Sequence, residues 1–433
     1  MPRPRPPSRI DAVATPLFGI TWWADPGSGA SVVAHCGGGG SAATGVKNTI
    51  TVVTSAPPEY PVATGELVIS SGDQVGVAIN VVKNPITNKL RLFVGLGSKV
   101  HVYDLQTGEL DEQVSVGDNV NALAVNSLTS RLAVGCESGT VKIFAIDNSR
   151  DKFENELPVR TLEGHTKAVS AVYFAPRGED KLVSSGKDGT ARVWQGEDCL
   201  SVLECSIEDP TGPKPKRPQQ VLVRGCAFGD LMGDLVYTVA SGRKGKAFLS
   251  RWVATEDGYQ CDVRTECSPF PISAMCLSGD AGMMALGAVD GTIVLWGIEK
   301  WKPLKKFFEV HDLPVTCIAA RPFPVPLLCD QDNDGDEMHA LSASADSQLA
   351  WLTLQRRSKS SKNRPPSDVN FKMILHSMLK MAVLGWILYP VANEIKDKCD
   401  MPPRGGFGSA FQCIRHEVLL APTSRPGIAV PPH

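Results

Sequence analysis

Four consecutive glycines stand near the start of the chain, in the stretch HCGGGGSAATGVKNTI that runs from His35 to Ile50. Glycine weakens a regular helix or strand by roughly 0.5–1 kcal/mol relative to alanine, so this run marks backbone that needs unusual dihedral angles or a close approach to another group. A common use of such a loop is to bind phosphate groups through backbone N–H groups. The first question is therefore whether residues 37–48 hold a nucleotide.

Two phosphate-binding patterns come close to this loop and fail. Gly38, Gly40 and Ala43 satisfy the loose spacing of a dinucleotide-binding loop, which also needs a strand before it and a helix after it. The segment that follows, NTITVVTS, is rich in β-branched residues and predicts a strand, so the helix N-terminus that would hold a pyrophosphate is missing. The phosphate-loop pattern fails because one extra residue, Val46, precedes the lysine. We therefore expect a long loop between two strands.

The composition limits the classes of function. The chain has 433 residues and a net charge of −2, which gives no overall basic field for nucleic acid. Its twelve cysteines include no Cys-x-x-Cys pair, and most stand in apolar runs, which argues against a zinc site and against a disulfide framework. The strand-like segments carry no enzyme motif. We expect neither an enzyme nor a small-molecule substrate.

A repeated unit organises the chain around the loop. Residues Gly164–Gln195 resemble a nearly complete WD repeat, with an opening Gly-His, two strands, an Asp-Gly turn and a third strand that ends in tryptophan. In the WD-repeat pattern His165, Asp188 and Trp194 belong to a buried hydrogen-bond network that ties the turn to its sheet. Such a network stiffens the sheet when every member has a partner.

Weaker copies flank this repeat. Asp290 precedes Trp296 with the same spacing, and the last copy ends at Trp351, one position early. We count seven copies, which predicts an all-β, seven-bladed WD-repeat β-propeller of four-stranded blades over residues 16–354. Residues 1–15 are expected to form a flexible N-terminus.

An acidic insertion precedes the last copy. The run DQDNDGDE, from Asp330 to Glu337, matches the opening of a calcium-binding loop. The twelfth position, where a bidentate glutamate belongs, is Leu341. We therefore expect a disordered acidic loop.

The end of the chain predicts a membrane anchor. A basic linker at 355–370 leads to a transmembrane helix at 371–393, whose apolar part is long enough to cross a bilayer, and a polar tail follows at 394–433. Lysine and arginine are more frequent before the apolar segment than after it, which puts the propeller in the cytosol and the tail on the other side. Lys380 inside the segment costs about 2.5–3.5 kcal/mol at a helix centre unless it snorkels. An amphipathic helix packed on the propeller is the alternative.

This combination of a cytosolic propeller, a C-terminal anchor and a glycine loop in the first blade resembles the prolactin regulatory element-binding protein family. The resemblance is strongest in the stretch GGGGSAATGVKN. Members of that family are exchange factors of the endoplasmic reticulum, which load GTP onto the Sar-type small GTPase that starts the COPII coat. The resemblance implies the same activity here, in a single-pass protein of the endoplasmic-reticulum membrane with a luminal C-terminus.

The resemblance also implies roles for the loop residues. In the family a potassium ion organises the loop, and backbone carbonyl groups supply the neutral oxygens that potassium prefers. The implied potassium ligands, mostly backbone carbonyls, are Gly39, Gly40, Ser41, Ala42, Thr44, Gly45 and Asn48. The implied GTPase contacts and exchange residues are Val46, Lys47 and Asn48.

Two other functions stay open. A membrane-anchored WD-repeat scaffold would assemble partners without exchange activity, and its glycines would be a plain insertion. A soluble nuclear propeller that binds nucleic acid is disfavoured by the weak basic composition. If the tail is luminal, Cys399 and Cys413 lie in an oxidising compartment, where they can pair.

Overall fold

The structure is a computed structural model that describes residues 9–355, apart from residues 26–27, 42–44, 56–62, 179, 208–219, 244 and 323–336. The chain divides into two compact units, Met1–Ser358 and Lys359–His433, and all described residues belong to the first. In the part of the chain that is described, no helix is long and apolar enough to cross a membrane. The predicted anchor at 371–393, the tail and nearly all of the linker lie outside the described residues.

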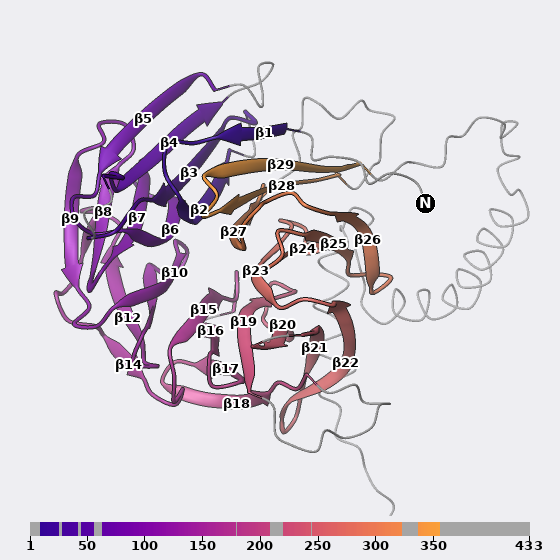
Figure 1. Cartoon of the computed structure of the whole chain (residues 1–433). Helices are drawn as coiled ribbons and strands as arrows, with labels where there is room; N and C mark the ends of the chain where they lie inside the picture. Colours follow the sequence, from indigo (N-terminus) through magenta and orange to yellow (C-terminus); the bar gives the residue numbers. More distant parts are fainter. Residues whose placement is uncertain are drawn as a thin grey trace, which may run out of the picture. The chain divides into compact units, whose positions relative to one another are not determined.

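The described strands form seven antiparallel sheets, the blades (Figure 1). Blade 1 contains β2 (Leu17–Ala24), β3 (Ser31–Gly37), β4 (Thr49–Ser55) and β5 (Gly65–Ser70). Blade 2 contains β6 (Gly76–Lys83), β7 (Leu90–Leu96), β8 (Lys99–Asp104) and β9 (Leu110–Ser115). Blade 3 contains β10 (Val120–Asn126), β11 (Arg131–Cys136), β12 (Val141–Asp147), β13 (Lys152–Phe153) and β14 (Arg160–Leu162).

The remaining blades follow in chain order. Blade 4 contains β15 (Val169–Phe174), β16 (Lys181–Gly186), β17 (Thr190–Gln195) and β18 (Asp198–Glu204). Blade 5 contains β19 (Val221–Phe228), β20 (Leu235–Gly242), β21 (Ala247–Thr255) and β22 (Gly258–Ser268). Blade 6 contains β23 (Ile272–Leu277), β24 (Met283–Ala288), β25 (Ile293–Gly297) and β26 (Lys302–Phe307). Blade 7 contains β27 (Val315–Ala320), β28 (Glu337–Ser344), β29 (Gln348–Gln355) and β1 (Arg9–Ala12).

The sequence pattern of each strand follows its place in the blade. The second strand of a blade is covered on both sides by neighbouring blades, and β24 (MMALGA) is accordingly apolar and buried along its whole length. The outermost strand has one wet side, and β5 (GELVIS) alternates between exposed and partly buried residues. A strand buried on both faces reads as a continuous apolar run, whereas a half-buried one alternates. This gradient explains why the repeats look most alike in their inner strands.

The first strands of the blades meet around the centre of the ring. Each of β2, β6, β10, β15, β19 and β23 contacts the first strand of the next blade, and β27 contacts β2, which closes the ring. In every blade the first strand carries one extra residue opposite the second strand, a β-bulge that increases local twist. The bulges lie at Leu17/Gly19, Gly76/Ala78, Val120/Ala122, Val169/Ala171, Val223/Gly225, Ile272/Ala274 and Val315/Cys317. The seven predicted copies are thus confirmed as seven blades.

The ring is closed by the start of the chain, which corrects the predicted boundary at residue 16. Strand β1 pairs antiparallel with β29, with Arg9 opposite Trp351 and Ala12 opposite Gln348. Residues 9–12 therefore supply the fourth strand of blade 7 and do not belong to a separate N-terminal segment. The physical reason is that β29 would otherwise present an unpaired edge of backbone N–H and C=O groups.

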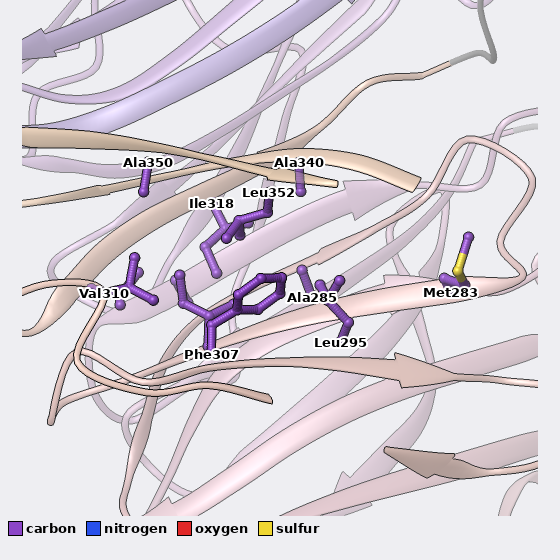
Figure 2. Close-up of a cluster of buried hydrophobic side chains, with 12 residues drawn as sticks. Met283, Ala285, Leu295, Phe307, Val310, Ile318, Ala340, Ala350 and Leu352 are labelled. Carbon is purple, nitrogen blue, oxygen red and sulfur yellow. The ribbon is translucent and has the colours of Figure 1, made fainter. Parts of the chain in front are cut away.

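The hydrophobic cores lie between neighbouring blades. Figure 2 shows the cluster between blades 6 and 7, where Phe307 and Leu295 of blade 6 face Ile318 and Leu352 of blade 7. Equivalent clusters occupy the other blade junctions, and the buried cysteines lie within them, as Cys36 does between blades 1 and 2. A blade is stable only with both neighbours in place, because each neighbour covers one of its apolar faces.

Candidate functional site

The strand order assigns the connections to two opposite faces. Antiparallel neighbours reverse direction, so the second-to-third-strand connection of each blade lies at the same end as the connection to the next blade. We call this end the loop face. First-to-second-strand and third-to-fourth-strand connections lie at the other end, which we call the hairpin face. The contact between His165, which precedes β15, and Asp188, in the β16–β17 turn, confirms that both kinds of loop-face connection meet.

The glycine loop is the β3–β4 connection of blade 1 and lies on the loop face. It occupies residues 38–48, whereas the equivalent connection of blade 2 is Gly97–Ser98. Both flanking segments are strands, as predicted, so no helix N-terminus stands here for a phosphate. Residues 42–44 of the loop, which include the predicted potassium ligands Ala42 and Thr44, lie outside the described residues.

Asn48 braces this loop from inside. Its side chain is buried, with 5% of its surface exposed. The amide oxygen Oδ1 accepts a hydrogen bond from the Gly40 backbone N–H at 2.9 Å, and Nδ2 donates to the carbonyl oxygens of Gly40 at 3.2 Å and Gly72 at 2.9 Å. One side chain therefore joins the glycine loop to the connection that leads into blade 2. The Asn48 carbonyl strengthens this junction by accepting from the N–H of Ser71 at 3.1 Å.

The glycines next to Asn48 are required by this arrangement. Gly38 has φ +147°, and a Cβ atom built on it would lie 2.2 Å from Asn48 Oδ1. Gly40 has φ +77°, in the left-handed region that L side chains rarely adopt. The close approach that the glycine run predicted is therefore made within the same chain, by Gly38 to Asn48 and by Gly37 to the Pro16 carbonyl, where a Cβ atom would lie 1.8 Å from the oxygen.

The predicted partner contacts divide into two groups. Val46 is 37% exposed and Lys47 is exposed as well, so both are accessible to a partner on the loop face. Asn48 is buried beneath them, which sequence reasoning did not anticipate. Its position makes it a residue that holds the loop rather than one that lies on the surface.

The structure describes some of the oxygen atoms that are predicted to bind potassium. The Gly40 carbonyl and Asn48 Oδ1 each already accept one hydrogen bond. A carbonyl oxygen has two lone pairs, so the hydrogen bonds from described residues leave each of these oxygens one further acceptor position. Gly39 is half-buried, whereas Ser41 and Gly45 are exposed. Neutral oxygens of this kind fit potassium chemistry, and the site remains a prediction.

A second polar cluster, in blade 4, is structural. His165 Nδ1 lies 3.1 Å from Asp188 Oδ2, which fixes this nitrogen as the donor, and His165 Nε2 accepts from the Ser184 hydroxyl at 2.9 Å. Trp194 Nε1 donates to Ser184 Oγ at 2.9 Å. Burial lowers the pKa of His165, and the Asp188 carboxylate opposes only part of this effect, so the ring is neutral near pH 7. The predicted network is confirmed, with Ser184 as a link that the sequence pattern did not single out.

Blade 7 carries a second copy of this network. His311 bonds Asp346 through Nδ1 at 3.1 Å and Ser342 through Nε2 at 2.9 Å. Trp351, one position early in the repeat, points to the other side of the blade. Its Nε1 donates to Asp11 at 2.8 Å and its ring packs edge-on against Trp22, 5.6 Å between centroids. In this shifted position Trp351 contacts β1 and blade 1, and it thereby helps to close the ring.

Metal-ligating side chains do not gather elsewhere in the described residues. Within them, no group of three or more His, Cys, Asp or Glu side chains is placed to hold a metal ion. The acidic run that resembles a calcium loop, at 330–336, falls outside the described part.

Comparisons with known proteins agree with the fold. Residues 156–195, which include the blade 4 network, match the WD40 family, described as "WD domain, G-beta repeat". The chain is thus a seven-bladed β-propeller that contains a WD40 repeat in blade 4. Proteins built on WD40 propellers are mostly non-enzymatic scaffolds for protein interaction.

Several curated proteins are similar to this WD40-repeat propeller. The target of rapamycin complex subunit wat1 of Schizosaccharomyces pombe is 22% identical over 60% of this chain and 73% of its own length. The nuclear distribution protein nudF of Aspergillus niger is 26% identical over 46% of this chain and 44% of its own. A WD repeat-containing protein 91 homolog of Dictyostelium discoideum is 30% identical over 22% of this chain and 12% of its own. The match thus spans less than half of the last two relatives, and none of the three names refers to an exchange factor.

Proposed function

We propose that this protein is a guanine nucleotide exchange factor for a Sar-type small GTPase, and that the glycine loop is the part that acts on the GTPase. The observation that carries the proposal is the construction of the loop. It is much longer than the corresponding turn of blade 2, it is braced internally by Asn48, and it leaves Val46 and Lys47 exposed at its end. A plain insertion has no need of a buried asparagine that bonds two separate connections.

Exchange needs binding energy and no covalent chemistry. A factor that binds the nucleotide-free GTPase more tightly than the loaded one must, by linkage, weaken nucleotide binding by the same factor. Val46 offers apolar contact area and Lys47 offers a cation beside it. Preorganisation by Asn48 lowers the entropy lost when the loop inserts into the partner. A potassium ion bound by carbonyl oxygens of the loop would stiffen the loop further.

Location is the second element of the proposal. The apolar segment Met373–Ala392 anchors the protein in the endoplasmic-reticulum membrane, with the propeller in the cytosol and the C-terminus in the lumen. Its support is the length of the segment and the excess of lysine and arginine before it. Exchange on a membrane-anchored propeller would place the activated GTPase where COPII vesicles form.

A membrane-anchored scaffold is the second candidate, because the WD40 propeller is most often an interaction platform. A scaffold would bind its partners on any face and would tolerate changes in the glycine loop. The two candidates therefore differ in what Val46 and Lys47 do.

The test measures nucleotide release from a purified Sar-type GTPase in the presence of residues 1–358, the compact unit that contains the closed ring. We expect the propeller to accelerate release, and the double change Val46→Ser, Lys47→Ser to remove most of the acceleration. Val289→Ser is the matched control, since Val289 is also 37% exposed and lies in the corresponding turn of blade 6. No acceleration by the parent, or equal loss in the control, would refute the proposal.

A further inference from the structure

Three hairpins on the hairpin face display apolar residues by the same device. In each, an asparagine or aspartate at the end of the first strand accepts a hydrogen bond from the backbone N–H two residues later. Ile86 N–H donates to Asn84 at 2.7 Å, Leu128 N–H donates to Asn126 at 3.0 Å, and Met232 N–H donates to Asp230 at 3.1 Å. Such a turn is stabilised by the asparagine or aspartate side chain and does not depend on the side chain at its tip.

These tip residues are largely exposed. Ile86 is 63% exposed, Leu128 71%, Leu231 51% and Met232 55%. Single exposed apolar residues are ordinary, but here they recur at equivalent places in blades 2, 3 and 5. The hairpin of blade 4, between them, presents the exposed Arg177.

Hydrogen bonds join the four hairpins into one row. Asn84 Nδ2 donates to the carbonyl of Asn148 at 2.8 Å, and Asn148 Nδ2 donates to the carbonyl of Ser127 at 3.3 Å, which ties blade 2 to blade 3. Asn126 Nδ2 donates to the carbonyl of Ala175 at 3.5 Å, which ties blade 3 to blade 4. The Arg177 N–H donates to the carbonyl of Leu231 at 2.8 Å, which ties blade 4 to blade 5. We call this row, at residues 84–89, 127–130, 175–178, 180 and 229–234, the hairpin arc.

The acidic groups at the blade 5 end of the arc are already engaged. The Asp230 carboxylate accepts from the N–H groups of Met232 and Leu235. Asp234 pairs with Lys181 at 3.2 Å. The arc therefore offers to its surroundings the exposed apolar tips, Arg177 and the Asp234 side chain, which is 65% exposed in its pair with Lys181.

The chain leaves the propeller at this same face. Strand β29 starts at Gln348, in the turn whose Asp346 bonds His311 on the loop face, and it ends at Gln355 on the hairpin face. Residues 356–372 then separate Gln355 from the apolar segment. A chain of that length spans at most roughly 60 Å when fully extended, which limits the distance between the end of β29 and the apolar segment.

We propose that the hairpin arc rests on the surface of the bilayer in which Met373–Ala392 is anchored. Ile86, Leu128, Leu231 and Met232 enter the headgroup boundary, and Arg177 contacts lipid phosphate. Apolar side chains with an adjacent cation are the groups that bind at a membrane interface. The proposal rests on the anchored location given under Proposed function. It goes further by fixing the orientation, because the glycine loop on the opposite face then points away from the lipid.

The test uses the full chain in phosphatidylcholine vesicles. A photoreactive benzoylphenylalanine replaces Leu128 in one variant and Ile86 in another, and it replaces Val46 or Val289 on the loop face in two controls. We expect lipid adducts at 86 and 128 to exceed those at 46 and 289 roughly tenfold, since only the first pair lies in the headgroup region. Equal adduct yields on the two faces, or adducts to protein alone at 86 and 128, overturn the proposal.

Two further measurements distinguish failure of the proposed orientation from failure of the proposed function. Flotation of the vesicles after alkaline carbonate treatment reports the anchor, and loss of the protein from the vesicles overturns the anchored location and this orientation together. Nucleotide release by the soluble propeller reports exchange without any membrane. An anchored, exchange-active protein with no lipid adducts at 86 and 128 refutes the orientation alone.

Discussion

Replacement of Asn48 by alanine separates a residue that holds the glycine loop from one that touches the partner. Among the described residues, the side chain makes three hydrogen bonds, to Gly40 and Gly72. At a net contribution of about 1 kcal/mol each, Asn48→Ala removes about 3 kcal/mol from the braced state of the loop. This corresponds to roughly a hundredfold shift toward the released loop, at 1.4 kcal/mol for each factor of ten.

Hydrogen exchange of the Gly40 amide is the direct assay, because its acceptor is Asn48 Oδ1. We expect protection of this amide to fall about a hundredfold in residues 1–358 carrying Asn48→Ala. The midpoint of thermal unfolding falls by only a few degrees, since the bonds join two surface connections and leave the blade cores intact. Acceleration of nucleotide release falls together with the protection.

Asn48→Asp provides a sharper comparison. The carboxylate keeps an acceptor for the Gly40 N–H but loses the donor and places negative charge against the carbonyl oxygens of Gly40 and Gly72. We expect the loop to be released at least as much as by alanine. If Asn48→Ala abolishes exchange while Gly40 stays protected, Asn48 acts on the partner directly and the bracing argument is wrong. If protection is lost and exchange is unchanged, the loop is not the exchange element.

The remaining predictions concern stability. Trp194 and Trp296 are equally buried, but Trp194 Nε1 donates to Ser184, whereas Trp296 Nε1 has no hydrogen-bond partner among the described residues. Trp→Phe therefore costs about 1 kcal/mol more at 194 than at 296, as measured by urea unfolding, and equal costs would show that the bond contributes nothing. Burial lowers the pKa of His35 to about 4, below its usual 6.5. The unfolded chain thus takes up this proton first as the pH falls, and stability drops from about pH 6.5 down to pH 4. The loss between pH 7 and pH 5 is about 2 kcal/mol, and His35→Gln should reduce the pH dependence by that amount.

The sequence carried enough local information to predict the seven blades. Each repeat has an inner strand that is apolar throughout, and the spacing of Asp188 and Trp194 fixes where the turn and the third strand lie. Ser184 could not be singled out in the same way. It stands next to Ser185 in the run VSSG, and only the register that places Ser184 opposite Arg192 shows which hydroxyl faces the His165 ring.

Contacts between distant parts of the chain could not be predicted from the pattern of the repeats. The strand Arg9–Ala12 is too short to show a pattern of its own, and its partner β29 lies at the other end of the propeller. The family resemblance implies a GTPase contact and a potassium ligand at Asn48, and neither role indicates that its side chain is buried. Its burial depends on Gly72, which reaches it only once β4 and β5 have paired.

The closure of the ring also decides which face the chain leaves. A fourth strand of blade 7 supplied by residues after β29 would run back from the hairpin face and would end at the loop face. Here β1 fills that place, so the chain after Gln355 departs from the hairpin face. With the first arrangement, a membrane-anchored protein would have its linker leave from the loop face, which would draw the glycine loop toward the bilayer. The N-terminal strand therefore does more than seal an edge, because it keeps the exit and the glycine loop on opposite faces.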